Sequence, residues 1–207
     1  VQKDPKTYEH INPEEVGNTR NIVVSDQSGK SNIISRLKSI KINIEQSDPK
    51  IKKLLDEVKD REFIGYSYDG ADASFELLAR RIIGEIPRYM SINEYDVSVK
   101  KNKSGEIVSS AKALLEVDGE KITCEGEGNG PVNALDNAIR QNVDKLAKYS
   151  KYLKDLKLVD YKVRILNTGT EAVTRVSIES TDSQGKNWFT IGVSTNIIDA
   201  SFKALID

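Results

Sequence analysis

The stretch AKALLEVDGEKITCEGEGNGPVNALDNAI, residues 111–139, changes its hydrophobic period partway along its length. Apolar residues alternate from Ala111 to Val117, and the dipeptide Asp118-Gly119 then signals a hairpin into a second strand, KITCEG. After the glycines, apolar residues recur at helical spacing, at Val132, Leu135, Ile139, Val143 and Leu146. Because YDVSVK (95–100) also alternates, the sequence predicts the order strand, strand, strand, helix.

The same order of elements returns nearer the C-terminus. VDYKVRIL (159–166) alternates, RVSIES turns through residues 182–185 into NWFTIGV, and STNIIDASFKALI has helical spacing. A shift of 66 positions superposes small and apolar pairs, namely Gly126 on Gly192, Val132 on Ile198, Ala134 on Ala200, Ala138 on Ala204 and Ile139 on Leu205. We therefore predict an α+β fold in which residues 90–207 hold a duplicated βββα unit, as two antiparallel three-stranded sheets with helices covering one side. Two unrelated α+β halves are the alternative.

Residues 1–89 read as a smaller, mostly helical linker region. A loop and a short strand, NIVVS (21–25), precede helical patterns at 26–40, 47–63 and 69–83. The apolar stripes of these helices comprise Ile33, Ile34, Leu37 and Ile40, then Ile51, Leu54, Leu55 and Val58, then Phe75, Leu78, Ala79 and Ile82. Ser47 or Asp48 is expected to cap the second helix, with Pro49 in its first turn.

The composition excludes several classes of protein. With 38% apolar and 30% charged residues and a net charge of −1, the chain has no overall charge that favours nucleic acid or an anionic membrane. No apolar run reaches the roughly 18 residues of a membrane span. The single cysteine, Cys124, fits a reducing cytoplasm. The chain begins Val1-Gln2-Lys3, as expected of a fragment of a longer protein, although a trimmed tag would look similar.

The glycine-rich segment GEGNG (126–130) indicates a small anion site. It lacks the Lys and Ser or Thr of a P-loop, and its G-x-G-x-G spacing is not the dinucleotide fingerprint. Pro131 suits the first helical position, with Asn129 or Gly130 as the cap. The N–H groups of Val132 and Asn133 would then be free, and a carboxylate fits them. The alternative is that the glycines only make a tight turn between strand and helix.

The second repeat offers polar residues at the matching place. Ser194, Thr195 and Asn196 precede Ile197 and open the second helix. A hydroxyl or amide oxygen there could accept a hydrogen bond from an ammonium group. A carboxylate site, an ammonium site and an apolar lining together describe a site for an amino acid.

Two motifs carry a family resemblance. GEGNGPVNALDNAI (126–139) and IGVSTNIIDASFKALID (191–207) resemble the C-terminal regulatory domain of the isopropylmalate synthase and citramalate synthase family. TYEHINPEEVGNTRNIVVSDQSGKSN (7–32) resembles the linker before that domain. This stretch and GYSYDGADASFELL (65–78) look more like citramalate synthases than isopropylmalate synthases. The resemblance covers essentially the whole chain.

The resemblance implies a larger enzyme. Its N-terminal (β/α)8 barrel condenses acetyl-CoA with a 2-oxo acid, pyruvate in citramalate synthases, using a divalent metal. That barrel is not in this sequence, whose only histidine is His10 and which has no cluster with metal-ligand spacing. We therefore expect no cofactor here and no condensation by this chain alone. Tyr8 matches a tyrosine that reaches into the partner subunit's active site, where His10 could accompany it.

The resemblance also implies that residues 90–207 form a homodimer and bind the end product as feedback inhibitor at the dimer interface. That effector is isoleucine for a citramalate synthase and leucine for an isopropylmalate synthase. Carried over residue by residue, the pocket comprises Gly128, Asn129, Gly130, Val132 and Asn133 of one repeat, with Tyr161, Ser194, Thr195, Asn196 and Ile197 of the other. A purely structural dimerisation domain and a small autonomous enzyme are the alternatives from other functional classes.

Overall fold

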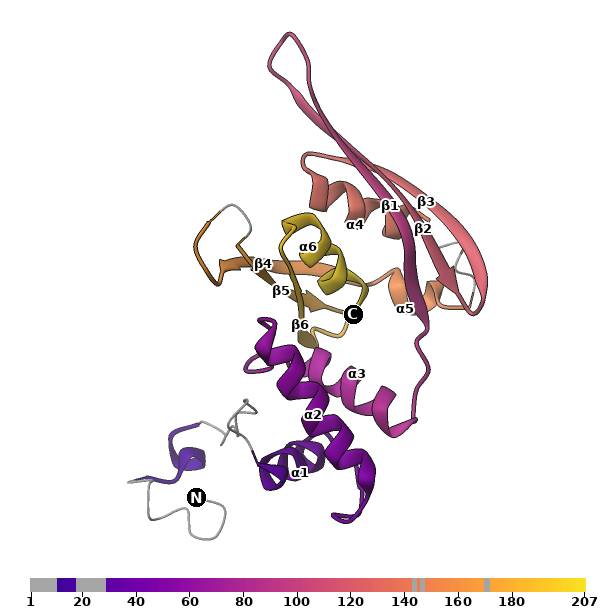
Figure 1. The fold of residues 1–207 in the computed structure, drawn as a ribbon. Helices are drawn as coiled ribbons and strands as arrows, with labels where there is room; N and C mark the ends of the chain where they lie inside the picture. Colours follow the sequence, from indigo (N-terminus) through magenta and orange to yellow (C-terminus); the bar gives the residue numbers. More distant parts are fainter. Residues whose placement is uncertain (1–10, 18–28, 143–144, 146–147, 170–171) are drawn as a thin grey trace.

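The structure is a computed structural model that describes residues 11–17, 29–142, 145, 148–169 and 172–207 (Figure 1). A short 3-10 helix, Pro13–Val16, precedes α1 (Lys30–Ser39), α2 (Pro49–Phe63) and α3 (Asp72–Ile83). The first sheet and its helices follow, as β1 (Met90–Lys101), β2 (Ile107–Val117), β3 (Glu120–Gly128), α4 (Pro131–Gln141) and α5 (Ser150–Leu153). The chain continues with β4 (Lys157–Ile165), β5 (Thr174–Thr181), β6 (Asn187–Ser194) and α6 (Ile197–Ile206). The strand expected at 21–25 lies outside the described residues.

Helices α1, α2 and α3, here called the helical part, share one core. The apolar stripes expected from the sequence meet there, and Ile33, Leu37, Leu54, Val58, Phe75 and Ala79 are buried together. Asp48 is the cap of α2, since its Oδ1 accepts a hydrogen bond from the N–H of Lys50 at 2.8 Å. Pro49 occupies the first turn of that helix, as predicted.

The first βββα unit is an antiparallel sheet in the order β1-β2-β3, with α4 packed on one face. Alternate residues of β2 face that helix and are buried, namely Ala111, Ala113, Leu115 and Val117. Asp118 and Gly119 both have positive φ, 53° and 83°, as a two-residue type I′ hairpin requires. Helix α4 ends at Gln141. Val143 and Leu146, which were expected on its apolar face, lie outside the described residues.

The second unit repeats this arrangement in the order β4-β5-β6, with α6 against β5 and β6. The strand expected from the alternation of Val159, Tyr161, Val163 and Ile165 is present, but these residues are not all buried. A bulge between Leu158 and Asp160 changes the register of β4. Val163 and Ile165 remain 41% and 68% exposed. The physical reason is that β4 is an edge strand and α6 covers mainly its neighbours.

Equivalent details confirm the duplication. The bulge in β1 falls at Asn93 and the one in β4 at Val159, 66 positions apart, and a tyrosine follows each two residues later. Gly126 and Gly192 also correspond. A Cβ on Gly126 would lie 2.4 Å from the backbone N of Ala138, and one on Gly192 would lie 2.0 Å from the carbonyl oxygen of Ala200. Each glycine therefore lets its helix lie directly on its sheet.

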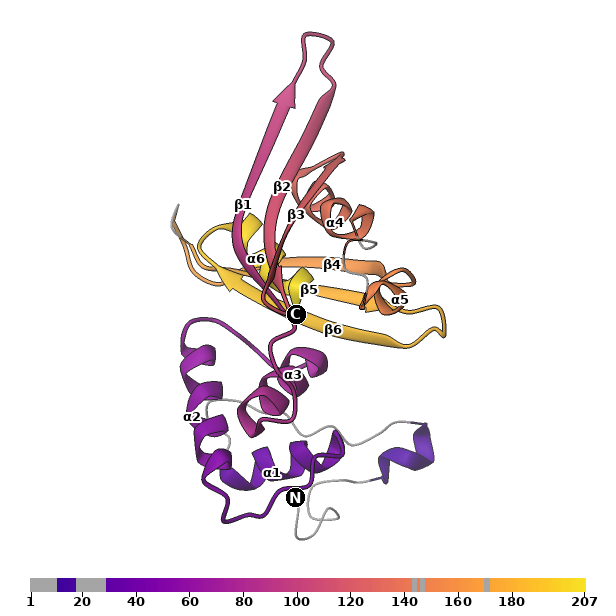
Figure 2. The same cartoon turned by 90° about the vertical axis from the view of Figure 1, so that its right-hand side faces the viewer.

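Helix α6 of the second unit packs into the core of the first unit, and the second unit contacts the helical part through α3. Phe202 of α6 is fully buried in the first unit's core, where its ring meets that of Tyr95 edge-on at 5.1 Å. Figure 2 shows the helical part at one end of the molecule and the β1–β2 hairpin projecting at the other. Helix α3 packs against β6, so the helical part adjoins the edge of the second sheet.

Candidate effector site

The glycine-rich loop, residues 126–130, ends β3 and opens α4. Gly130 is the residue before the helix, in an extended conformation with φ of −160°, and no side chain caps the helix from this position. Pro131 takes the first helical position, as the sequence predicted. The first bond of the helix runs from the N–H of Ala134 to the carbonyl of Gly130, at 2.9 Å.

The three glycines of the loop differ in what surrounds them. A Cβ on Gly126 would meet the backbone of α4, and one on Gly128 would lie 2.4 Å from Oδ1 of Asn133. A Cβ on Gly130 would have nothing within 4 Å. Gly126 and Gly128 are therefore needed for helix-to-sheet packing, whereas Gly130 borders open space.

The N-terminus of α4 leaves backbone donors free. Within the described part of the chain, no group accepts a hydrogen bond from the N–H of Val132 or Asn133. The Asn133 side chain instead accepts from the N–H of Asn129 at 3.2 Å, which fixes the loop above Gly128. These free N–H groups carry the partial positive charge of the helix end, where an anion is stabilised.

Ser109 is a polar residue at this site that the sequence analysis missed. It pairs with Gly128 across β2 and β3, so the two residues lie on the same, helix-facing side of the sheet. Ser109 is fully buried, and its Oγ has no hydrogen-bond partner in the part of the chain that is described. A buried hydroxyl without a partner costs free energy, and a ligand could recover it only if the glycine-rich loop moved aside, because no surface of Ser109 is exposed. No sequence signal distinguishes Ser109 from an ordinary strand serine.

In the second repeat, a side chain caps the N-terminus of α6. The Oδ1 of Asn196 accepts hydrogen bonds from the N–H groups of Ile198 at 2.8 Å and Asp199 at 3.3 Å. Ser194 accepts from the N–H of Asn196 at 3.2 Å. Thr195 is exposed, and the side chain of Ile197 is 44% exposed. The α6 end is therefore satisfied internally, in contrast to α4.

Residues 69–207 match the model of the LeuA allosteric (dimerisation) domain. The chain belongs to this family. The LeuA match includes α3 although that helix packs with α1 and α2. The preceding residues 1–64 match the homocitrate synthase post-HMGL domain-like family.

Several curated synthases are similar to this chain over its whole length. The chain is 46% identical over 210 residues to an (R)-citramalate synthase of Aquifex aeolicus and 43% identical to one of Geobacter sulfurreducens, in each case over 100% of this chain and 39% of that protein. A probable 2-isopropylmalate synthase of Methanopyrus kandleri is 27% identical, with the same coverage. The chain thus spans 39% of the length of these curated relatives and resembles their shared C-terminal region.

Tyr161 of the LeuA domain lies against α6 rather than against the glycine-rich loop. Its hydroxyl is 2.7 Å from Oγ of Ser201, which itself donates to the carbonyl of Ile197 at 2.6 Å, so Tyr161 is the donor. Tyr161 therefore joins the cluster of Ser194, Asn196 and Ile197. Among described residues, no hydrogen bond connects this cluster to Gly128–Asn133.

The remaining questions from the sequence concern Tyr8 and His10, a metal site, and Cys124. Tyr8 and His10 lie outside the described residues. In the described part, no three His, Cys, Asp or Glu side chains are grouped to hold a metal ion, and no helix has the length and apolar character that crossing a bilayer requires. Cys124 is fully buried, and burial raises the pKa of its thiol. This environment favours an inert core thiol over a nucleophile.

Proposed function

We propose that this chain is the linker and regulatory portion of a citramalate synthase, and that its LeuA domain binds isoleucine as a feedback inhibitor. The names of the relatives that are 40–46% identical support the citramalate assignment. In the intact enzyme, a catalytic barrel outside this sequence would condense acetyl-CoA with pyruvate and hold a divalent metal. Tyr8 and His10 would support that chemistry, and this chain alone would be inactive.

One observation carries the effector site. The free N–H groups of Val132 and Asn133 lie at a helix N-terminus, and the buried, unpartnered hydroxyl of Ser109 lies beside Gly128 on the same side of the sheet. Backbone donors at a helix end suit a carboxylate, and the hydroxyl of Ser109 would suit a second polar group of the same ligand once the loop moves aside to expose it. The open space next to Gly130 gives the ligand access to the backbone.

A second copy of the chain completes the proposed site. The cluster of Tyr161, Ser194, Asn196 and Ile197 is separate from the glycine-rich loop within one chain, and the exposed Ile197, Val163 and Ile165 supply apolar surface near it. In a homodimer, the dimer partner would bring such a cluster to the loop and enclose the aliphatic side chain. Isoleucine would act by favouring one arrangement of the cytoplasmic enzyme over another.

Two other readings make different predictions. The same region of an isopropylmalate synthase would take leucine, and the probable 2-isopropylmalate synthase at 27% identity shows that such a protein shares this region. A purely structural dimerisation domain would bind neither amino acid. The packing roles of Gly126 and Gly128 are compatible with that reading, whereas the open helix end and Ser109 are not explained by it.

Titration calorimetry of the chain with isoleucine, leucine and valine separates these readings. We expect isoleucine to bind more tightly than leucine. The difference is limited to roughly 1–3 kcal/mol, because the two side chains differ only in the position of a methyl group. Tighter binding of leucine would assign the chain to isopropylmalate synthesis. A folded dimer that gives no heat with any of the three would leave only the structural reading.

The variant Ser109→Ala tests the site itself. We expect it to weaken isoleucine binding roughly two- to tenfold, the range for one hydrogen bond, without lowering the stability of the free chain. Ser110→Ala is the matched control, because Ser110 lies on the opposite face of β2 and its hydroxyl is 3.3 Å from that of Ser98. Equal isoleucine affinities for Ser109→Ala and the unmodified chain would remove Ser109 from the site.

A further inference from the structure

A cavity of about 450 Å³ lies between the helical part and the duplicated domain, away from the glycine-rich loop. Its walls come from the end of α2, the last turns of α3, the start of β1, and α6. Its volume is within the range of small-molecule sites, roughly 300–1,000 Å³. A ligand held there would touch both parts of the molecule at once.

The charged side chains that line the cavity do not balance. Glu57 pairs with Arg61 at 2.7 Å, Asp207 with Arg81 at 2.8 Å, and Asp199 with Lys203 at 2.7 Å. Arg88 also lines the cavity, and no ion pair or hydrogen bond joins its side chain to any residue that the structure describes. Arg88 is therefore the lining cation that no described carboxylate pairs with, and its charge can attract an anion.

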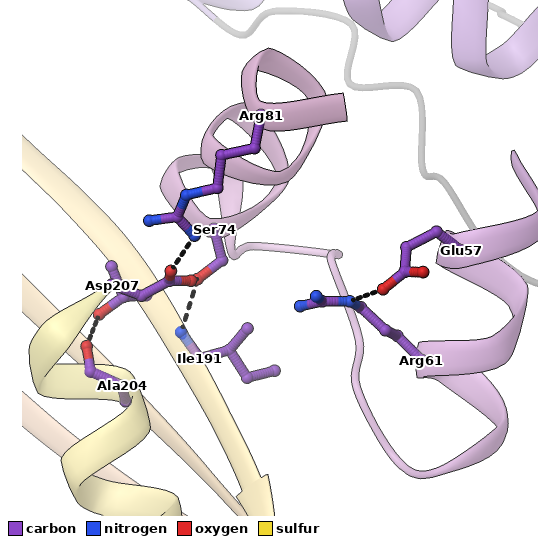
Figure 3. A network of polar contacts seen from close by, with 8 residues as sticks. Glu57, Arg61, Ser74, Arg81, Ile191, Ala204 and Asp207 are labelled. Atoms are coloured by element: carbon purple, nitrogen blue, oxygen red, sulfur yellow. Dashed lines mark hydrogen bonds and ion pairs between the residues drawn. The ribbon is translucent and has the colours of Figure 1, made fainter. Parts of the chain in front are cut away.

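The arginines also have donors that their partners do not use. Among the described residues, Arg61 donates to Glu57 through its Nε alone, and its guanidinium also lies 5.5 Å from the ring centre of Tyr66. Figure 3 shows the rest of that guanidinium pointing away from Glu57, toward the side on which Ile191 and Asp207 lie. The Nε of Arg81 is buried and has no hydrogen-bond partner among the described residues. Buried donors of this kind are normally satisfied, so the cavity lacks an acceptor. A carboxylate is the acceptor whose geometry fits guanidinium groups.

Much of the remaining wall of the cavity is apolar, although Ser91, Tyr66 and Tyr95 also line it. Met90 and Ile92 of β1, Ile191 of β6 and Ile206 of α6 line it beside the charged groups. A short aliphatic chain attached to the carboxylate would be removed from water there. An amino acid suits the cavity less well, because its ammonium group would lie close to the unpaired guanidinium of Arg88.

We propose that this cavity binds a small aliphatic monocarboxylate, with the carboxylate on Arg88 and Arg61 and the chain against Ile92, Ile191 and Ile206. The site is independent of the proposed isoleucine site, which lies at the start of α4. Bound there, the carboxylate stabilises the contact between the helical part and the duplicated domain, which Ser74, Arg81 and Asp207 already hold (Figure 3).

The test is a titration of the whole chain, methyl-labelled at isoleucine, leucine and valine, with isovalerate, followed by NMR. We expect saturable shifts of the methyl groups of Ile92, Ile191 and Ile206. Arg88→Gln and Arg61→Gln should each raise the dissociation constant about tenfold or more, as expected for lost charge-assisted hydrogen bonds. Arg164→Gln is the matched control, because Arg164 is exposed on β4 and does not line the cavity.

Isovaleramide, which has the same shape without the charge, should leave these methyl groups unmoved. The proposal is overturned if isovalerate produces no shifts, or if the amide shifts the same methyl groups to the same extent. It is also overturned if both arginine variants bind as tightly as Arg164→Gln. Shifts confined to Val132 and Leu135, at the start of α4, would place the carboxylate in the other site and overturn it as well.

Discussion

The hydroxyl of Ser74 in α3 accepts a hydrogen bond from the backbone N–H of Ile191 in β6, at 3.0 Å. The same oxygen donates to Oδ2 of Asp207 at 2.8 Å, and Arg81 donates to the other oxygen of that carboxylate (Figure 3). Because β6 is an edge strand, α3 satisfies an amide that would otherwise lie on an open sheet edge. One serine thus links the helical part to the second sheet.

We expect Ser74→Ala to lower the free energy of unfolding by about 1–3 kcal/mol, because it leaves the buried N–H of Ile191 without an acceptor. Urea unfolding followed by circular dichroism measures this loss. Ser183→Ala serves as the control, since Ser183 is exposed and should change stability by less than about 0.5 kcal/mol. A similar small change in both variants would show that α3 does not depend on this contact.

Gly126→Ala should cost roughly 1–3 kcal/mol of stability, because its Cβ would overlap the backbone of α4. Gly130→Ala is the paired variant. Gly130 belongs to the same loop, two positions after Gly128. A Cβ on Gly130 would meet open space and the backbone there is extended, so we expect little change in stability. The thermal unfolding temperatures of the two variants show whether Gly126 is required for packing and whether Gly130, beside the proposed ligand, is not. Equal losses would contradict the different roles assigned to them.

Asn196→Ala should destabilise the chain by about 1 kcal/mol, because its side chain caps two N–H groups of α6. Asn129→Ala should have almost no effect, since within the described ranges the backbone N–H of Asn129 forms a hydrogen bond and its side chain forms none. Chemical denaturation of the two variants checks the asymmetry between the repeats. A comparable loss for Asn129→Ala would mean that the α4 end is capped after all.

Asp118 should make stability depend on pH. Hydrogen bonds from Tyr149 at 2.8 Å and Lys148 at 3.1 Å lower the pKa of this carboxyl below its ordinary value of 3.8. A lowered folded-state pKa means that the contribution is present above the ordinary pKa and is lost as pH falls through the folded value. Asp118→Asn should therefore be less stable than the unmodified chain at neutral pH, and the two should converge in acid. A difference in urea midpoint that is constant with pH would contradict this.

Cys124 should resist thiol reagents in the folded protein, because it is fully buried and burial raises the pKa of its thiol. Reaction with Ellman's reagent should be slow in native buffer and fast in guanidinium chloride, where the one cysteine of each chain becomes accessible. Rapid reaction of the native protein would reveal frequent opening of the first core.

The local patterns of the sequence predicted most of the fold because they depend on neighbouring residues. The alternation from Ala111 to Val117, the Asp118-Gly119 turn and the cap at Asp48 each act within a few positions, and the structure confirms all of them. The 66-position repeat was also visible, because the packing of helix on sheet restricts Gly126 and Gly192 to glycine.

Features that depend on how elements pack were not predictable in the same way. The exposure of Val163 depends on where α6 lies, and the burial of Ser109 depends on how α4 closes over the sheet. The cavity is the clearest case, since Arg61, Arg88 and Lys203 come from separate segments that only the tertiary structure brings together.

Phe202 belongs to α6 of the second unit, but its side chain is fully buried beside Tyr95 in the core of the first. The first unit alone would expose a large apolar gap at that position. The first unit therefore cannot complete its core without α6. A single-copy ancestor would have had to fill the gap with the helix of another molecule, and the tandem repeat turns that exchange between molecules into a contact within one chain.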